Sequence, residues 1–358
     1  MSLLALTCRF VRRTGSEVCR HSSTFRRAYL EKYNKPITIQ EAKEKKLKGG
    51  EARVKVHCCS INPSDVLLTQ GVNPANFSIP VVPGYEFTGI VTEINECKNV
   101  AKGDRVVALS KEKLGGFAGE CIVNEKDIWL LPSNVPFDEG AALVDSFGTA
   151  MLGLSHRAKL QEKQIVLATF APVHGYAALD IAANVFKAKV IAVCMNERDT
   201  ENLRERGAWS TLAYSEKQML EGVKKLTKNK GVDVVYDTLA GDVLKSCLKC
   251  VRHEGNIIVA GYTLKELPQV SISQMLSLPS FSISGVSLAS YRKYNFQIYR
   301  QVVSDVLEMK EQGLISPTIT SKYPMAKINE AFEEIKTKQP IGKILMEMKE
   351  QGLISPTI

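Results

Sequence analysis

The chain has 358 residues, 44% of them hydrophobic, and a formal net charge of +9. This length exceeds one ordinary domain and predicts two, each with its own core. The sequence contains no run of about 20 apolar residues, the length that a helix needs to span a bilayer, so we expect no membrane-spanning helix. The positive charge raises the question of a nucleic-acid partner, and the answer depends on where the charges lie.

Much of the excess charge lies in residues 1–27, MSLLALTCRFVRRTGSEVCRHSSTFRR. They hold six arginines against one acid, Glu17, a net charge of +5 that leaves +4 for the rest. A leader rich in arginine and serine and poor in acids is typical of a mitochondrial transit peptide. We therefore expect import into the mitochondrial matrix and removal of residues 1–27; a disordered basic tail is the alternative. A nucleic-acid partner is not expected.

Residues 28–135 read in chain order as a compact, mostly β domain. The segments 51–62 (EARVKVHCCSIN), 87–94 (FTGIVTEI) and 103–110 (GDRVVALS) alternate and are rich in β-branched residues, with turn residues between them. The lysine-rich stretch 42–50 (AKEKKLKGG) is interpreted as a solvated loop rather than an RNA-contact patch. The domain is expected to carry the mostly-β half of the fold.

From about residue 137 the rhythm changes to strands that alternate with helices. A helical stretch over 138–158 is followed by expected strands at 164–170, 189–194, 210–213, 232–239 and 255–262. Helices are expected between them, over 175–188, 197–208, 215–229 and 241–251. This alternation predicts a doubly wound parallel sheet, in which a ligand lies beyond the carboxyl ends of the strands.

Nine cysteines, an odd number, argue against a disulfide framework. Cys247 and Cys250 form a lone C-x-x-C within an expected helix and are interpreted as buried thiols. The 12-residue sequence EMKEQGLISPTI occurs at 308–319 and again at 347–358. The second copy follows an expected closing strand, and we interpret it as a local duplication without a function of its own.

Six segments together carry a family resemblance: CCSINPSDVLLTQG, VPGYEFTGIV, KGDRVVAL, GAALVDSFGTA, DVVYDTLAGDV and IGKIL. The chain resembles the zinc-free quinone oxidoreductases of the medium-chain dehydrogenase/reductase superfamily. The resemblance implies an α/β protein with a GroES-like catalytic domain over 28–149 and a doubly wound Rossmann domain over 150–293. A return segment over 294–346 would complete the catalytic domain, and 347–358 would be a duplicated tail.

The resemblance also implies a function. It is that of an NADPH-linked reductase of quinones or α,β-unsaturated carbonyls (enones), assembled as a homodimer. Zinc-dependent relatives carry a cysteine where this chain has Asn62 and a histidine where it has Tyr85, so no zinc is expected. Asn62, Tyr85 and Thr149 match positions at the reaction centre, and Asp65 is expected to orient its loop. Leu67 stands where the family commonly has a cleft tyrosine.

The cofactor shell implied by the resemblance is only partly kept. The family turn is rich in glycines that let backbone N–H groups approach the pyrophosphate. Here two of them are replaced by Pro172 and Val173, and Gly175 remains. His174 is either a pyrophosphate ligand or, as we expect, a solvent-facing turn residue. The expected cofactor contacts are Asn62, Thr149, Gly175, Asn196, Arg198, Tyr214, Leu239, Gly261 and Tyr262.

Two hypotheses follow. The first is an NADPH-dependent reductase of a quinone or enone, with NADPH favoured over NADH. The second is a non-catalytic binding protein that keeps the fold and has lost productive cofactor binding. Pro172 and Val173 favour the second hypothesis, whereas Asn62 and Thr149 favour the first, which we adopt.

Overall fold

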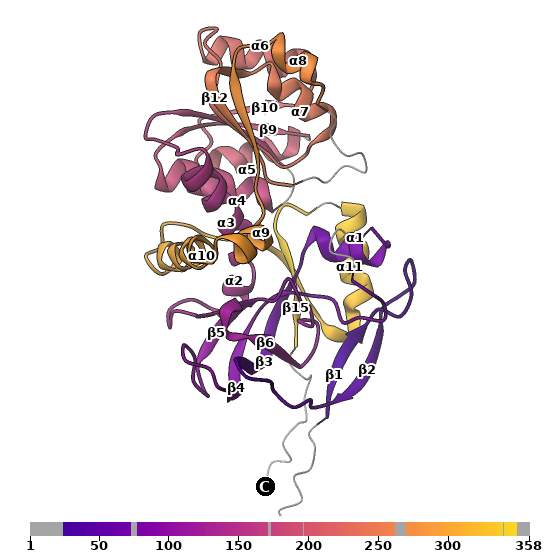
Figure 1. The fold of residues 1–358 in the computed structure, drawn as a ribbon. Helices are drawn as coiled ribbons and strands as arrows, with labels where there is room; N and C mark the ends of the chain where they lie inside the picture. The colour runs from indigo at the N-terminus through magenta and orange to yellow at the C-terminus, as the bar shows by residue number, and fades with distance from the viewer. Residues whose placement is uncertain are drawn as a thin grey trace, which may run out of the picture.

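Two sheets of different kinds form the two halves of the protein, which lie one above the other in Figure 1. The computed structural model describes residues 24–72, 77–170, 173–195, 197–261, 270–338 and 340–348, without the side chains of residues 198 and 274. The fold class expected from the sequence, a GroES-like domain with a Rossmann-type parallel sheet, is confirmed.

The lower sheet has seven strands in the order β14-β15-β3-β4-β5-β7, with β6 also paired to β3. Its strands come from two distant parts of the chain, because β14 and β15 return to it from the C-terminal end. β3 is buried along nearly its whole length, as a central strand covered on both faces must be. The strands are β3 (Glu51–Ile61), β4 (Glu86–Asn95), β5 (Arg105–Leu109), β6 (Glu120–Asn124), β7 (Ile128–Leu130), β14 (Ile319–Pro324) and β15 (Lys343–Glu347).

A separate antiparallel hairpin joins β1 (Thr24–Tyr29) to β2 (Thr38–Lys43). The backbone of β1 is fastened to the domain, since Gly119 N–H donates to the Arg26 carbonyl and Ala28 N–H donates to the Phe117 carbonyl. Four residues expected in the leader, 24–27, therefore belong to a strand of six. The lysine-rich loop is also shorter than expected, because β2 runs to Lys43.

The upper sheet is fully parallel, with six strands in the order β10-β9-β8-β11-β12-β13. The order reverses between β8 and β11, which is the point where doubly wound sheets bind ligands. Its strands are apolar on both faces, and helices cover both. They are β8 (Ile165–Phe170), β9 (Lys189–Cys194), β10 (Ser210–Ala213), β11 (Val232–Asp237), β12 (Val251–Val259) and β13 (Phe281–Gly285).

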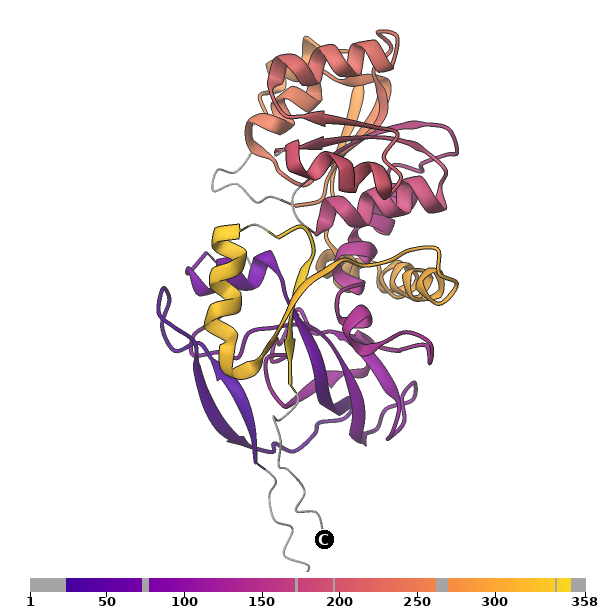
Figure 2. The same ribbon diagram turned by 180° about the vertical axis from the view of Figure 1, so that it is seen from behind.

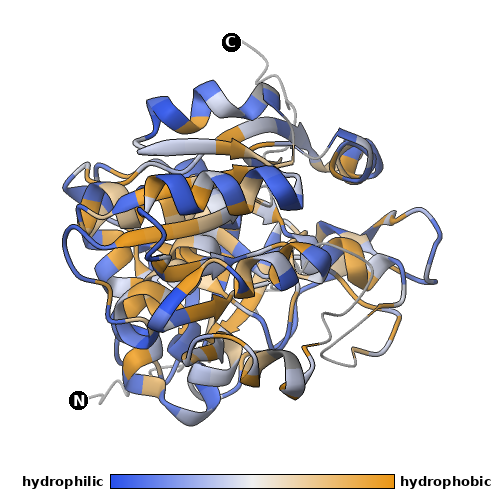
Figure 3. Ribbon diagram, turned by 90° about the horizontal axis from the view of Figure 1, so that it is seen from above, coloured by the Kyte–Doolittle hydropathy of each residue, from blue (hydrophilic) through white to orange (hydrophobic). Residues whose placement is uncertain are grey.

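Helices connect and cover the two sheets, and Figure 2 shows the same arrangement from behind. Figure 3 shows hydrophilic residues on the outward helix faces and hydrophobic residues along the strands. α3 packs against both α4 and α10 and so ties the halves together. The helices are α1 (Pro63–Thr69), α2 (Phe137–Ala141), α3 (Val144–Met151), α4 (His174–Asp180), α5 (Thr200–Glu205), α6 (Glu216–Leu226), α7 (Gly241–Leu248), α8 (Ile272–Leu276), α9 (Leu288–Tyr294), α10 (Phe296–Glu311) and α11 (Ile328–Lys338).

Some boundaries differ from those expected. α7 ends at Leu248, and β12 already begins at Val251, so Cys250 lies between them, although both cysteines of the C-x-x-C are buried. The second 12-residue repeat begins inside β15 at Glu347, and its residues 349–358 lie outside the described part. In the described ranges, no helix combines the length and apolarity that crossing a bilayer requires.

Candidate active site

The end of β3 and the start of α1 position Asn62, which is the N-cap residue of α1. The Asn62 N–H donates to Asp65 Oδ2 at 2.9 Å, which closes the first turn of α1, and Gly84 N–H donates to Asp65 Oδ1 at 3.0 Å. Asp65 thus fixes two backbone segments, in agreement with the orienting role expected for it. Both side chains are buried.

A fully buried ion pair lies beside Asn62. Lys343 Nζ, from β15, is 2.6 Å from Glu86 Oε2 and 2.5 Å from Asn62 Oδ1. The side chains of Lys343 and Glu86 are 1% and 0% exposed, so solvent does not screen the two charges. Glu86 Oε2 also accepts from Ser60 Oγ at 2.6 Å and from Asn62 Nδ2 at 3.0 Å. These bonds compensate both charges within the core.

Tyr85 precedes Glu86 and forms a second hydrogen-bonded chain. Its hydroxyl donates to Asp145 Oδ2 at 2.7 Å and accepts from Ser64 Oγ at 2.9 Å. Lys111 Nζ lies 2.5 Å from Asp145 Oδ1, and the Asp145 N–H donates to Glu86 Oε1 at 2.9 Å. Asp145 therefore joins the tyrosine chain to the buried ion pair.

The surroundings shift the acid strengths of these groups. Burial raises the pKa of Tyr85 well above its ordinary value, and the neighbouring Asp145 and Asp65 raise it further, so the phenol stays protonated. Burial alone would raise the pKa of Asp145, but Lys111 and Lys343 hold it well below its usual range. Burial raises the pKa of Asp65 to about 7 against its two backbone hydrogen bonds.

The expected nucleotide turn lies between β8 and α4. Val173 caps α4 with φ of 79° and ψ of −65°, a region that a β-branched residue rarely enters. Its N–H donates to the Ile341 carbonyl at 3.3 Å. A Cβ at Gly175 would lie 2.9 Å from Phe170 Cα, so glycine there lets α4 approach β8 closely.

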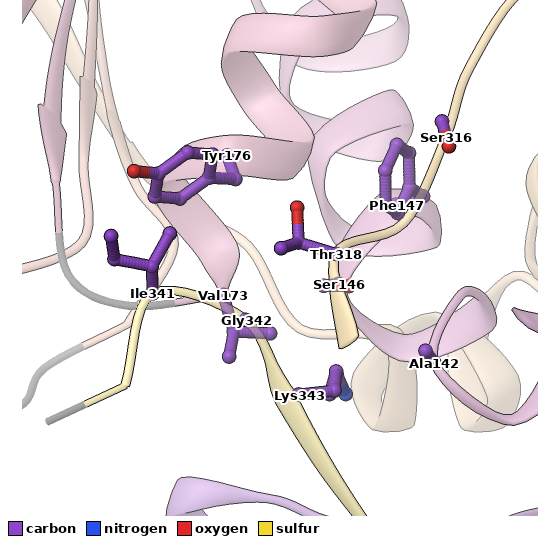
Figure 4. Close-up of a pocket in the computed structure, with 10 residues that line it drawn as sticks. All are labelled: Ala142, Ser146, Phe147, Val173, Tyr176, Ser316, Thr318, Ile341, Gly342 and Lys343. Carbon is purple, nitrogen blue, oxygen red and sulfur yellow. The ribbon is translucent and has the colours of Figure 1, made fainter. Parts of the chain in front are cut away.

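Figure 4 shows Ile341 and Gly342, the two residues before β15, beside Val173 of this turn and Tyr176 of α4, with Lys343 following at the start of β15. The cavity that these residues line together has a volume of only about 10 Å³. A Cβ at Gly342 would lie 2.4 Å from the Thr318 carbonyl, so the segment cannot carry a larger residue there. The turn and the buried ion pair are therefore linked by three consecutive residues.

His174 is the first residue of α4 and carries a polar group next to the turn. Its Nδ1 is enclosed and has no hydrogen-bond partner among the residues that the structure describes. Burial lowers its pKa to about 4 although Asp145 favours the charged form, and Lys343 and Lys111 lower it too, so the imidazole is neutral at pH 7. The expectation that His174 is a solvent-facing turn residue is wrong, because it is partly buried within α4.

The other residues expected at the site are spread over both halves. Thr149 is buried and its hydroxyl donates to the Asp145 carbonyl at 2.7 Å, so it contacts its own helix. Tyr214 is half-buried with its hydroxyl 3.4 Å from Ser246 Oγ, and Leu239 packs in the core. Gly261 is partly exposed beyond β12. Asn196, Tyr262 and the Arg198 side chain lie outside the described residues.

Five functional side chains were absent from the expected site: Ser64, Glu86, Lys111, Asp145 and Lys343. Four of them stand in segments that carry the resemblance, since Ser64 belongs to CCSINPSDVLLTQG, Glu86 to VPGYEFTGIV, Asp145 to GAALVDSFGTA and Lys343 to IGKIL. The signal available in the sequence was the presence of charged residues within otherwise apolar strands. It did not identify their partners.

The arrangement does not fit a zinc ion. Across the described ranges, no cluster of three or more His, Cys, Asp or Glu is arranged to hold a metal. The charge of Glu86 is already balanced by the Lys343 ammonium. The Asn62 side chain hydrogen-bonds both of these residues. Neither Asn62 nor Tyr85 is an ordinary zinc ligand.

Two family models match the halves of the chain. Residues 48–133 match the alcohol dehydrogenase GroES-like domain, and residues 175–307 match a domain described as zinc-binding dehydrogenase. Together with the fold and the site, they define a dehydrogenase/reductase of the medium-chain superfamily.

The relatives narrow this class further. The chain is 35% identical to quinone oxidoreductase-like protein 2 of Rattus norvegicus over 94% of this chain and 95% of that one. It is 35% identical to a homolog of the same protein from Nematostella vectensis, over 90% of this chain and 89% of that one. The chain therefore belongs to the quinone oxidoreductase-like proteins of the medium-chain dehydrogenase/reductase superfamily.

Solved structures share the fold at lower identity. A putative NADPH:quinone reductase from Bacillus thuringiensis superposes with a TM-score of 0.82 at 20% identity, over 91% of this chain and 99% of that one. A quinone oxidoreductase from Pseudomonas syringae pv. tomato DC3000 gives a TM-score of 0.81 at 22% identity, over 90% of this chain and 99% of that one. At these identities the likeness concerns the fold alone.

Proposed function

We propose that the protein is a metal-independent reductase that uses NADPH, in preference to NADH, to reduce a quinone or an α,β-unsaturated carbonyl. The observation that carries the proposal is the Tyr85 hydroxyl, which is held between Ser64 and Asp145 beside a charge-compensated cluster. A reduced carbonyl oxygen needs such a donor. The names of its quinone oxidoreductase relatives support the substrate class.

The chain has groups for each part of this chemistry. When bound, the nicotinamide would supply the hydride. Tyr85 would transfer its proton to the acceptor oxygen. This oxygen would replace Asp145 as the hydrogen-bond acceptor of the Tyr85 hydroxyl. Ser64 donates to the Tyr85 oxygen and is exposed, so it can return that proton and take another from water. One hydride and one proton reach the acceptor, which balances a two-electron reduction.

The cofactor fits this chain in part. The order of the upper sheet, the start of α4 beside β8 and the close packing at Gly175 suit a dinucleotide. The preference for NADPH rests on Tyr214, which matches a family tyrosine that contacts the 2′-phosphate, and on Arg198, which is adjacent to the positions that meet this phosphate in the family. The Val173 N–H is already bonded to Ile341, so the pyrophosphate would have to displace that carbonyl.

The hydrogen bond from the Val173 N–H to the Ile341 carbonyl favours a second candidate function. A protein whose nucleotide turn is closed by its own return segment would keep the fold and bind another ligand or a protein without catalysis. The cavity of about 10 Å³ between the turn and residues 341–343 supports this alternative.

A titration of the whole protein with NADPH and NADH, followed by cofactor fluorescence and by calorimetry, separates the candidates. Micromolar binding of NADPH with weaker binding of NADH supports the reductase. No binding of either at millimolar concentration contradicts it and favours the second candidate. In the first case, Tyr85→Phe should lower kcat on a quinone by about a hundredfold, because a positioned proton donor is lost. Tyr33→Phe, whose hydroxyl bonds only the Phe77 carbonyl among the described groups, serves as the control.

We further propose that the protein is a homodimer. In the described part of the chain, β13 ends the parallel sheet with one edge unpaired, although parallel sheets are normally covered. Nearby, Ile272 and Leu276 of α8 are 75% and 83% exposed. Sedimentation of the protein and of an Ile283→Lys variant tests this, with a monomeric variant as the expected result.

We also propose import into the mitochondrial matrix, which rests on the composition of residues 1–27. Because β1 begins at Thr24, cleavage that leaves this strand whole would fall before that residue. The test is whether a fluorescent protein fused behind residues 1–27 is imported. The control is the same fusion with the arginines of residues 1–27 replaced by glutamine.

A further inference from the structure

Lys111 reaches the cluster of Tyr85 and Asp145 from the solvent side. It comes from the loop after β5, its side chain is 25% exposed, and its Nζ lies 2.5 Å from Asp145 Oδ1. The same ammonium lies 4.9 Å from the centre of the Tyr85 ring. Lys111 thus contacts both the tyrosine and the carboxylate that accepts its proton.

The position of this charge has a chemical consequence for Tyr85. A buried carboxylate that accepts from a phenol binds that O–H strongly, because few solvent dipoles compete with it. A cation on the other carboxylate oxygen neutralises the charge and weakens this hold. Without the cation, the Tyr85 O–H would remain on Asp145 when a ligand needs it.

We propose that Lys111 is a positioning residue that, through Asp145, sets how readily the Tyr85 hydroxyl turns from Asp145 to the oxygen of a bound acceptor. The inference rests on the proposed reductase function and adds to it a residue that does not touch the reacting atoms. The hold of Asp145 on Tyr85 itself exists in the protein alone and can be measured there.

The charged groups around Asp145 predict a pH dependence. Asp145 on α3 is faced by Lys111 from the loop after β5, by Lys343 of β15 and by His174 of α4. Negative neighbours are Glu86 of β4 and Asp65 of α1. Removal of Lys111 leaves the carboxylate with weaker compensation, so its pKa rises.

The first experiment is kcat and KM of Lys111→Gln between pH 5.5 and 9 with NADPH and a quinone. At pH 8, kcat should be about tenfold lower with little change in KM, since the effect lies on proton donation. As pH falls, Asp145 becomes protonated and releases the Tyr85 O–H, so kcat should recover. Lys111→Arg should keep the wild-type profile, and Lys111→Gln with Asp145→Asn should restore kcat at pH 8.

The same loop provides a matched control. Lys113 Nζ lies 2.5 Å from Glu51 Oε1, as Lys111 does from Asp145, but Lys113 is 52% exposed and its partner is remote from the tyrosine chain. Lys113→Gln should leave both kcat and the pH profile unchanged. A Lys111→Gln loss that is equal at every pH, or that Lys113→Gln reproduces, would overturn the proposal.

A second readout separates this inference from the proposed function. The ¹³Cζ resonance of Tyr85, assigned by Tyr85→Phe, should shift with pH in Lys111→Gln as Asp145 titrates, and stay constant in the wild type. This result supports the positioning role even if no reductase activity is found. Identical Tyr85 resonances in both proteins across the pH range would overturn the inference, and an inactive wild type overturns only the reductase.

Discussion

The buried ion pair and the nucleotide turn lie at the two ends of the same three residues, and they are built in opposite ways. At one end, Lys343 makes short bonds to Glu86 and Asn62, and every bond compensates a buried charge. At the other end, Val173 has a positive φ, and His174 carries an enclosed nitrogen that finds no partner in the described part of the chain. We therefore expect substitutions in the ion pair to destabilise the fold, and substitutions in the turn to stabilise it.

The largest effect is expected for Lys343→Met. The variant leaves the Glu86 carboxylate buried without its cation, which costs about 3–5 kcal/mol in comparable pairs. The free energy of unfolding from urea titration at pH 7 is the measurement. Lys113→Gln breaks an ion pair at a half-exposed lysine and should cost no more than about 1 kcal/mol. Equal losses in the two variants would contradict the difference we draw between buried and exposed pairs.

The next effect concerns Asp65, whose pKa is raised to about 7 in the folded protein from about 4 in an unfolded chain. Since the folded state binds this proton more tightly, the contribution of Asp65 is largest below pH 4 and is lost as pH rises to 7. The loss should be about 3 kcal/mol, since each pKa unit of the difference corresponds to about 1.4 kcal/mol. Asp65→Asn should flatten the pH dependence of unfolding in that window, whatever its effect on absolute stability. An unchanged slope would show that Asp65 ionises normally.

The comparison also shows what a sequence can and cannot predict here. The alternation of strands and helices after residue 137 predicted the parallel sheet, because strands buried on both faces are uniformly apolar. The start of α1 was expected to hold Asp65 in an orienting role, and its two backbone bonds agree. Local pattern was sufficient for the sheet, and the family resemblance was sufficient for Asp65.

Pairing across the chain was not predictable. Lys343 and Glu86 are 257 positions apart, and nothing local to either residue names its partner. The repeated 12-residue sequence makes the same point, since Glu308 and Met309 lie within α10, whereas Glu347 ends β15. Identical residues take different structures because the neighbouring elements differ, and this tertiary context is absent from the pattern.

A third prediction applies to Val173. Val173→Gly should raise the free energy of unfolding by about 1 kcal/mol, because the positive φ is strained for valine and the relief exceeds the added freedom of the unfolded chain. It should also tighten NADPH binding, since the side chain no longer crowds the turn. Val185→Gly, in the helical segment after α4, is the control and should lose about 1 kcal/mol. Destabilisation of both variants would show that the turn is unstrained.

The smallest effect is expected at His174, where stability and binding separate the interpretations of the turn. His174→Val removes an enclosed nitrogen that has no partner within the described ranges and should gain about 1 kcal/mol at pH 7. The pKa of His174 is about 4 when folded and about 6.5 when unfolded, so the wild type loses stability as pH falls from 6.5 to 4. His174→Val should lack that slope, and His253→Gln, at an exposed position of β12, should keep it. If the valine variant instead loses NADPH affinity while it gains stability, the enclosed nitrogen serves the ligand and the turn is built for binding. If the affinity for NADPH is unchanged while stability rises, the enclosed nitrogen has no role in binding. It would then be a destabilising consequence of the contact between residues 341–343 and the turn.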